Sequence, residues 1–278
     1  MPVYEPSYRR FDGTRTEGWM RSWALVRNGV ERLLKQRRFL FLLALAWVPA
    51  VIRGGQIYAA RQFPQAGEWL QVSPELWESF LTQQISLLPV VLIALYAGSG
   101  AIASDLRSGA LVIYLSKPLS RTGYLLGKIL PVFFSLLSIT LVPALALLCL
   151  HIALANDLSL LRESPWLPLS IFTYSGCVAT YFSLVVLAIS SLTRSGRLAA
   201  AGFVLVAMGS HFAYQAASRL AFGDLPPFLS IVGAAIDAAH VFFGGGFTSY
   251  LSLLTMAALM AAAVLLMSRR LRSLGIRS

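Results

Sequence analysis

Six long apolar stretches alternate with shorter polar ones along the chain. Each stretch holds about 20 mostly apolar residues, the number that an α-helix needs to cross roughly 30 Å of hydrocarbon. The pattern therefore predicts an all-α membrane protein with a six-span transmembrane domain over residues 39–268. The expected spans are residues 39–59, 83–104, 126–152, 169–191, 198–218 and 248–268.

A further apolar stretch, residues 225–246, is too short to be a span. Its apolar part runs from Phe228 to Phe243, about 16 residues or roughly 24 Å of helix. Prolines precede it and glycines follow it. We predict a short re-entrant helical segment on the outer face, in which Asp237 and His240 share a helical side and face water or each other. We interpret this segment as part of an outer gate.

Residues 18–38 have the pattern of an amphipathic helix, with apolar side chains at three- and four-residue steps and polar ones on the opposite face. The apolar set is Trp19, Trp23, Val26, Val30 and Leu33, and the polar set is Arg21, Asn28, Arg32 and Lys35. We predict an interfacial helix that directs its tryptophans toward lipid and its basic groups toward anionic headgroups. A helix packed on a soluble domain is the alternative. Residues 1–17 are expected to be a cytoplasmic extension.

Composition supports the membrane class. Hydrophobic residues make up 57% of the chain and charged residues 13%, about half the charged share of a typical soluble domain. The two cysteines, Cys149 and Cys177, fall inside apolar stretches and have no metal-site spacing, so we expect them to be small buried hydrophobes.

The basic residues orient the spans. With both termini cytoplasmic, the segments on the inner side hold all but four of the 23 Lys and Arg residues; Arg53, Arg61, Arg162 and Arg219 are the exceptions. Residues 269–278 then form a basic cytoplasmic tail. This bias accounts for the net charge of +11 without any nucleic-acid partner.

The segment between the second and third spans is charged and compact. Ser104 and Asp105 can cap or stabilise a helix start, and Gly109 permits a sharp change of direction. Leu111, Tyr114 and Leu115 then form an apolar patch on about one helical turn, which Pro118 ends. Such a helix is suited to docking in a groove of a cytoplasmic partner. A plain loop with an interfacial helix is the alternative.

This segment resembles the cytoplasmic loop of ABC type-2 transporter permeases. An acidic residue, a glycine, an apolar run, "LSKPLSR" and "YLLGK" carry the resemblance, although Ala110 stands where threonine is commoner. The resemblance implies a bacterial inner-membrane permease that dimerises, exports a substrate, and receives force from two ATPase subunits through a coupling loop, residues 105–125. The coupling residues that it implies are Asp105, Arg107, Gly109, Leu111, Tyr114, Leu115, Pro118 and Arg121, followed by Lys128.

ATP hydrolysis is not expected in this chain. A phosphate-binding loop needs the spacing G-x-x-x-x-G-K-[ST], and the nearest stretch, "GYLLGKI", has the wrong spacing and lacks the hydroxyl. We therefore expect no cofactor here, with ATP and magnesium bound by a separate P-loop ATPase. A scaffold that anchors an ATPase without transport is an alternative.

Polar side chains within the apolar stretches are candidates for a translocation route. Ser210, His211, Tyr214 and Gln215 form two i, i+4 pairs in the fifth span, where helix–helix hydrogen bonding is the competing interpretation. Arg53 is expected to snorkel toward the outer interface. The histidines and Asp237 lack a metal-ligand spacing, which leaves an intramembrane metalloenzyme as a remote alternative. Gly98 and Gly100 predict close helix packing, within or between subunits.

Overall fold

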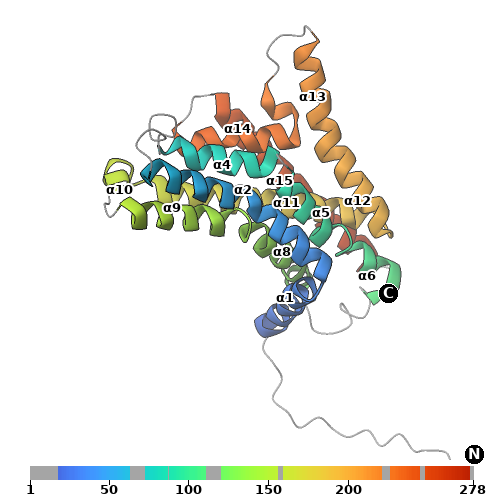
Figure 1. Cartoon of the computed structure of the whole chain (residues 1–278). Helices are drawn as coiled ribbons and strands as arrows, with labels where there is room; N and C mark the ends of the chain where they lie inside the picture. The colour runs from blue at the N-terminus through green and yellow to red at the C-terminus, as the bar shows by residue number, and fades with distance from the viewer. Residues whose placement is uncertain are drawn as a thin grey trace, which may run out of the picture.

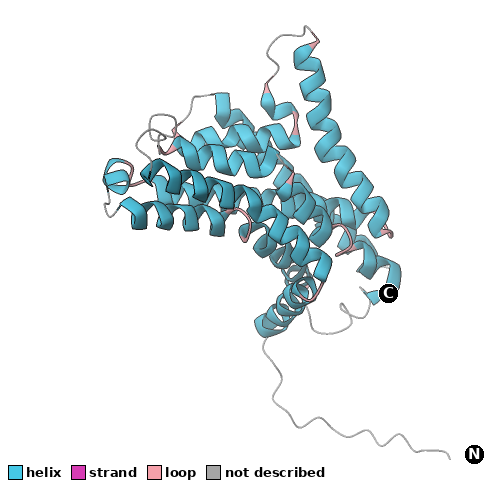
Figure 2. Cartoon of the chain, viewed as in Figure 1, coloured by secondary structure: helices cyan, strands magenta, loops and turns pink. Residues whose placement is uncertain are grey.

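The computed structural model describes residues 18–62, 73–86, 88–110, 120–155, 159–220, 226–244 and 248–275. Within these ranges the regular structure is helical and contains no strand (Figure 2). Six helical segments are long and apolar enough to cross a membrane. The predicted all-α fold with six spans is therefore confirmed.

Three of the six spans are continuous helices, and the other three are interrupted. The continuous spans are the first, α2 (Arg37–Gln62), the fourth, α11 (Leu167–Leu192), and the sixth, α15 (Thr248–Gly275). The second consists of α5 (Pro89–Gly98) and α6 (Ala103–Ser108), and the third of α8 (Arg121–Leu137) and α9 (Leu141–Ala155). The fifth consists of α12 (Gly196–Val204), a π-helical turn η1 (Leu205–Gly209) and α13 (Ser210–Arg219).

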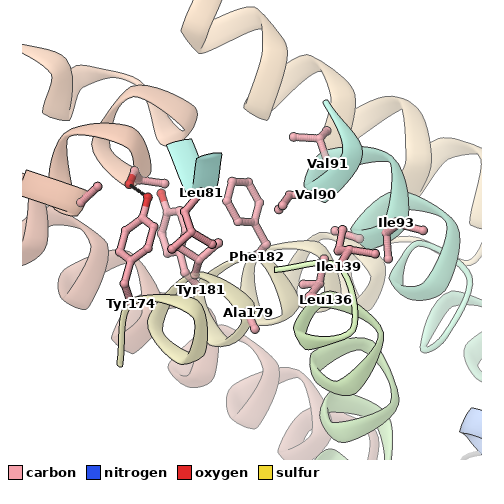
Figure 3. Packing of buried hydrophobic residues seen from close by; sticks show 14 of the residues in the cluster. Leu81, Val90, Val91, Ile93, Leu136, Ile139, Tyr174, Ala179, Tyr181 and Phe182 are labelled. Atoms are coloured by element: carbon pink, nitrogen blue, oxygen red, sulfur yellow. Dashed lines mark hydrogen bonds between the residues drawn. The ribbon is translucent and has the colours of Figure 1, made fainter. Parts of the chain in front are cut away.

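Helix α11 forms the centre of the bundle. About 72% of its most apolar window is buried, compared with 17% for the first and fifth spans. Figure 3 shows Tyr181 and Phe182 of α11 close to Leu81 and Val90, with Leu136 and Ile139 of the third span nearby. The other spans therefore pack around α11 and direct their remaining apolar surface outward.

Close packing at Gly98 fixes the second span against α11. A Cβ atom at Gly98 would overlap the side chain of Val186 on α11, so only glycine allows this approach. The predicted close contact is thus present within one subunit. At Gly100, a side chain would have open space around it.

The amphipathic helix α1 (Gly18–Leu34) packs along the start of α8. Added Cβ atoms at Gly123 and Gly127 of α8 would overlap Ser22 and Leu25 of α1, which places the two helices in direct contact. Val26 is buried, whereas Trp23 is 54% exposed. The predicted apolar face is therefore divided: part of it contacts the protein, and part remains available to lipid.

The polar side of α1 is exposed, as its sequence pattern indicates. Arg32 and Lys35 are both exposed, and the side chain of Trp19 lies outside the described residues. Arg27 Nε donates to Glu31 Oε1 at 2.7 Å, and this hydrogen bond lowers the pKa of Glu31. Insertion of this helix into the interface remains a prediction.

Two short helices lie side by side at the end of the bundle away from α1 (Figure 1). One, α14 (Ile231–Phe243), follows a single 3₁₀ turn, η2 (Pro227–Leu229), and corresponds to the short apolar segment predicted from the sequence. The other, α4 (Glu75–Ser86), was not predicted. Leu88, with a left-handed φ of 75°, separates α4 from α5, so the second span begins at Pro89 rather than at residue 83. A further short helix, α10 (Ser159–Glu163), precedes α11.

Candidate functional site

The two ends of the segment between the second and third spans have well-defined helix boundaries. Helix α6 ends at Gly109, whose φ of 69° is left-handed and readily adopted by glycine. Helix α8 begins at Arg121, after Ser120 accepts a hydrogen bond from the Gly123 amide at 3.0 Å. The expected capping by Ser104 is wrong, because α6 already begins at Ala103 and its N-cap position, Ile102, has no side-chain cap. Asp105 does lie in the first turn.

An ion pair connects these two helices. Lys128 Nζ lies 2.7 Å from Asp105 Oδ2, and the two side chains are only 16% and 12% exposed. The Tyr124 hydroxyl donates to the same carboxylate oxygen at 2.8 Å, and the Lys128 ammonium lies 5.6 Å from the centre of the Tyr124 ring. The residues that begin and end the family-like pattern are therefore in direct contact.

The remaining coupling candidates divide into two groups. Arg107 and Arg121 are exposed near the ends of the segment. Leu111, Tyr114, Leu115 and Pro118 lie outside the described residues, so the apolar patch remains a prediction. Tyr124 was missed in the sequence, although its i, i+4 spacing from Lys128 at a helix start was an available signal.

A buried serine ties α6 to the central helix. Ser190 Oγ donates to the Ser99 carbonyl at 2.7 Å and accepts from the amides of Ile102 and Ala103 at 3.2 and 3.1 Å. These bonds satisfy backbone groups at the interruption between α5 and α6, where regular helical bonding is lost. Hydrogen bonds to Ser190 therefore hold the interruption between α5 and α6 in place.

The polar residues of the fifth span contact the start of α14. Ser210 Oγ accepts from the Ile231 amide at 3.3 Å, and His211 Nδ1 lies 3.3 Å from Ser230 Oγ. Gln215 Nε2 lies 3.3 Å from His211 Nε2, and the Tyr214 ring lies 6.4 Å from the His211 ring. Hydrogen bonding between helices therefore accounts for Ser210 and His211, and lining of a route remains a proposal.

Asp237 and His240 of α14 contact two different neighbours. Ser252 and Ser249 of α15 donate to the Asp237 carboxylate, at 2.5 and 3.4 Å. His240 Nδ1 lies 2.5 Å from Glu78 Oε1 of α4. Asp237 and His240 do not face each other, because α15 and α4 lie on either side of α14 and each contacts one of them. The alternative expectation, that they face water, holds for the His240 side chain, which is 53% exposed.

Arg53 is held by α4. Its guanidinium donates to Ser79 and Gln83 of α4 at 3.4 Å, and to Gln56 of its own helix at 3.3 Å. These contacts are made with a helix that the sequence pattern did not reveal, and snorkelling of Arg53 toward the outer interface remains a prediction.

Two tyrosines of the central helix α11 donate hydrogen bonds to backbone carbonyls of α14. The Tyr174 hydroxyl donates to the Ala235 carbonyl at 2.7 Å (Figure 3). The Tyr181 hydroxyl donates to the Ile231 carbonyl at 3.4 Å. Together with the contacts of Asp237 and Ser230, these bonds connect α14 to α11, α15 and α13. The short helix α14 is thus joined to three spans by polar bonds.

Metal binding finds no support among the described residues. None of their His, Cys, Asp and Glu side chains form a group of three or more that could hold an ion. His151, the third histidine of the sequence, packs edge-on against Trp77 with ring centres 6.0 Å apart.

Comparison with known protein families identifies a match over most of the chain. A family profile described as "ABC-2 family transporter protein" matches residues 23–228, which is more than half of the chain. The matched range extends from α1 to η2 and includes both ends of the segment between the second and third spans, whereas α14 and α15 follow it. No curated protein matches the sequence.

Proposed function

Since this chain belongs to the ABC-2 family of transporter proteins, we propose that it is a permease subunit that exports a substrate with energy from a separate ATPase. The family match is the observation that carries the proposal. The six candidate spans support it, because they supply the membrane domain that a permease needs. A family permease is a membrane subunit and is not itself catalytic.

The proposed assembly contains two copies of this permease and two copies of a P-loop ATPase. ATP and magnesium bind to the ATPase chains. The assembly lies in a bacterial inner membrane with both termini of the permease in the cytoplasm, and the distribution of basic residues supports this orientation. The coupling loop, residues 105–125, is the proposed contact with the ATPase, and the exposed side chains of Arg107 and Arg121 support that role.

Replacing Leu115 with aspartate tests the coupling role. The substitution places a charge in the predicted apolar patch, and burying an unpaired charge costs several kcal/mol. We expect the variant to enter the membrane at normal levels, while ATP hydrolysis that co-purifies with the tagged permease from its host membranes falls at least about tenfold. The ATPase is identified in the same eluate by mass spectrometry.

Ser116→Asp is the matched control, because it adds the same charge at a neighbouring polar position. It should retain most of the co-purifying hydrolysis. If Leu115→Asp retains as much as this control, the segment is a linker and not a coupling element.

We also propose that α4 and α14 form an outer gate. The polar contacts of Asp237, His240 and Arg53 support this role, since they link both short helices to neighbouring elements and can be exchanged when the helices move. Ser210, His211, Tyr214 and Gln215 then lie beside the gate.

Single cysteines at positions 229, 237 and 243 test the placement of this gate. All three should react, at least in part, with a membrane-impermeant thiol reagent added from outside, and that at position 229 should react fastest because Leu229 is 56% exposed. Labelling is measured in intact cells by mass spectrometry, with Cys149 and Cys177 replaced by alanine. Reaction of position 229 from outside and of position 243 only from inside would show that α14 crosses the membrane, and would exclude the gate.

A further inference from the structure

We propose that Asp105, Tyr124 and Lys128 form a clamp that makes α6, α8 and α1 move as one body when the ATPase acts on the permease. The inference rests on the proposed function and adds the positioning residues through which movement is shared. The clamp is distinct from the proposed docking of the coupling loop on the ATPase. Its three side chains lie outside the predicted apolar patch and contact one another within this chain.

The first link of the clamp joins α6 to α8. One oxygen of Asp105 receives both the Lys128 ammonium at 2.7 Å and the Tyr124 hydroxyl at 2.8 Å. The Tyr124 side chain is fully buried, and the two charged groups are mostly shielded from water. Screening by solvent and salt is weak at such a site, so the pair resists separation more than an exposed ion pair would.

The second link joins α8 to α1. Gly123 and Gly127 flank Tyr124 along α8, one residue before it and three after it, and Ser22 and Leu25 of α1 lie directly against them. Pro131, one turn further along α8, lies against Gly29 of α1. Because these contacts leave no room for a side chain, α1 cannot slide along α8 without separating from it.

The clamped body has a defined boundary within the second span. The residues between α5 and α6 interrupt the helix, and Ser190 of the central helix bonds both sides of the interruption. Movement of α6 relative to α11 at this interruption requires loss of the hydrogen bonds from the Ile102 and Ala103 amides to Ser190, while α5 stays packed on α11 through Gly98.

Spin-label distances in the permease alone test the first link. With Cys149 and Cys177 replaced by alanine, labels are placed at Ser104 and Leu126, which are exposed on α6 and α8. The unmodified clamp should give one narrow distance distribution in lipid nanodiscs. Lys128→Met should broaden it at least about twofold, Tyr124→Phe should broaden it less, and Lys128→Arg should keep it narrow.

A second label pair separates loss of the clamp from loss of the fold. Asn28 and Leu126 are exposed on α1 and α8, which are joined by the glycine contacts and not by the ion pair. Their distance distribution should remain unchanged in Lys128→Met. An unchanged Ser104–Leu126 distribution in Lys128→Met would overturn the clamp, and so would equal broadening of both pairs.

The change of a label distance when nucleotide binds to the assembled complex tests whether α6, α8 and α1 move together. Labels at Asn28 on α1 and Leu192 at the end of α11 report displacement of α1 from the central helix when a non-hydrolysable ATP analogue is added. We expect the displacement in the unmodified complex and in Lys128→Arg, and its loss in Lys128→Met complexes that retain the ATPase. Full displacement in Lys128→Met would overturn the clamp while leaving the proposed function intact. No displacement in any complex would contradict the proposed function, whereas the nanodisc distances still decide the clamp.

Discussion

Replacing Trp77 with alanine is expected to lower the free energy of unfolding by about 3–5 kcal/mol, the range seen when a large aromatic side chain is removed from a core. Trp77 is fully buried on α4, its indole N–H donates to the Ala144 carbonyl of α9 at 3.3 Å, and its ring packs edge-on against His151. The truncation removes all three contributions and leaves a cavity between α4 and the third span.

The measurement is unfolding in mixed micelles with increasing denaturing detergent. Trp166→Ala is the matched control, because Trp166 is 39% exposed and its ring contact is with Phe243 at 6.3 Å. This control should cost about 1 kcal/mol, the usual contribution of an aromatic pair. Equal costs for the two variants would mean that α4 is not packed against α9 as described.

Lys128→Met is expected to destabilise the protein by about 3 kcal/mol, because it leaves the Asp105 carboxylate shielded from water without its cation. Replacing Asp105 in the same protein should offset most of this loss of stability. In the double variant Asp105→Leu, Lys128→Met, both charges are absent and no unpaired charge remains. Replacing a buried ion pair by apolar residues of similar volume is often neutral.

The same unfolding assay compares the single and double variants. We expect the double variant to regain at least about half of the lost stability, since it removes the uncompensated Asp105 charge and costs the Tyr124 hydroxyl its hydrogen bond to Asp105. A double variant as unstable as Lys128→Met would show that the uncompensated charge of Asp105 does not cause the loss of stability. The clamp would then have no electrostatic basis.

The spans could be predicted because hydrocarbon thickness sets a long, simple pattern. Helix α4 carries no such pattern: it has 12 residues, includes Glu75 and Glu78, and precedes an apolar stretch with which it merges in the sequence. What separates them is the left-handed backbone of Leu88, a conformation that the sequence does not indicate, because leucine rarely adopts it. Tertiary packing decides this boundary.

At the candidate site, the sequence did not indicate which side chains contact one another. Asp105 and Lys128 both belong to the family-like pattern, yet their contact depends on how α6 and α8 pack, and helical spacing cannot reveal that. For Asp237 and His240, the three-residue spacing was an available signal, but it did not show that the two side chains contact different helices. Three residues apart, they still diverge, because a short helix between two neighbours can direct adjacent side chains to each of them.

The π-helical turn at Leu205–Gly209 affects how the fifth span can change in length over evolution. A π-helical turn holds about one residue more than an α-helical turn, so a regular α-helix would span the same distance here with one residue fewer. A relative that lacks one residue here would form a regular helix and still direct Ser210 toward Ile231. A one-residue gap within α12 or α13 would instead rotate the following residues by about 100° and remove that contact. In an alignment of the family, length variation in this span is therefore expected at the π-helical turn.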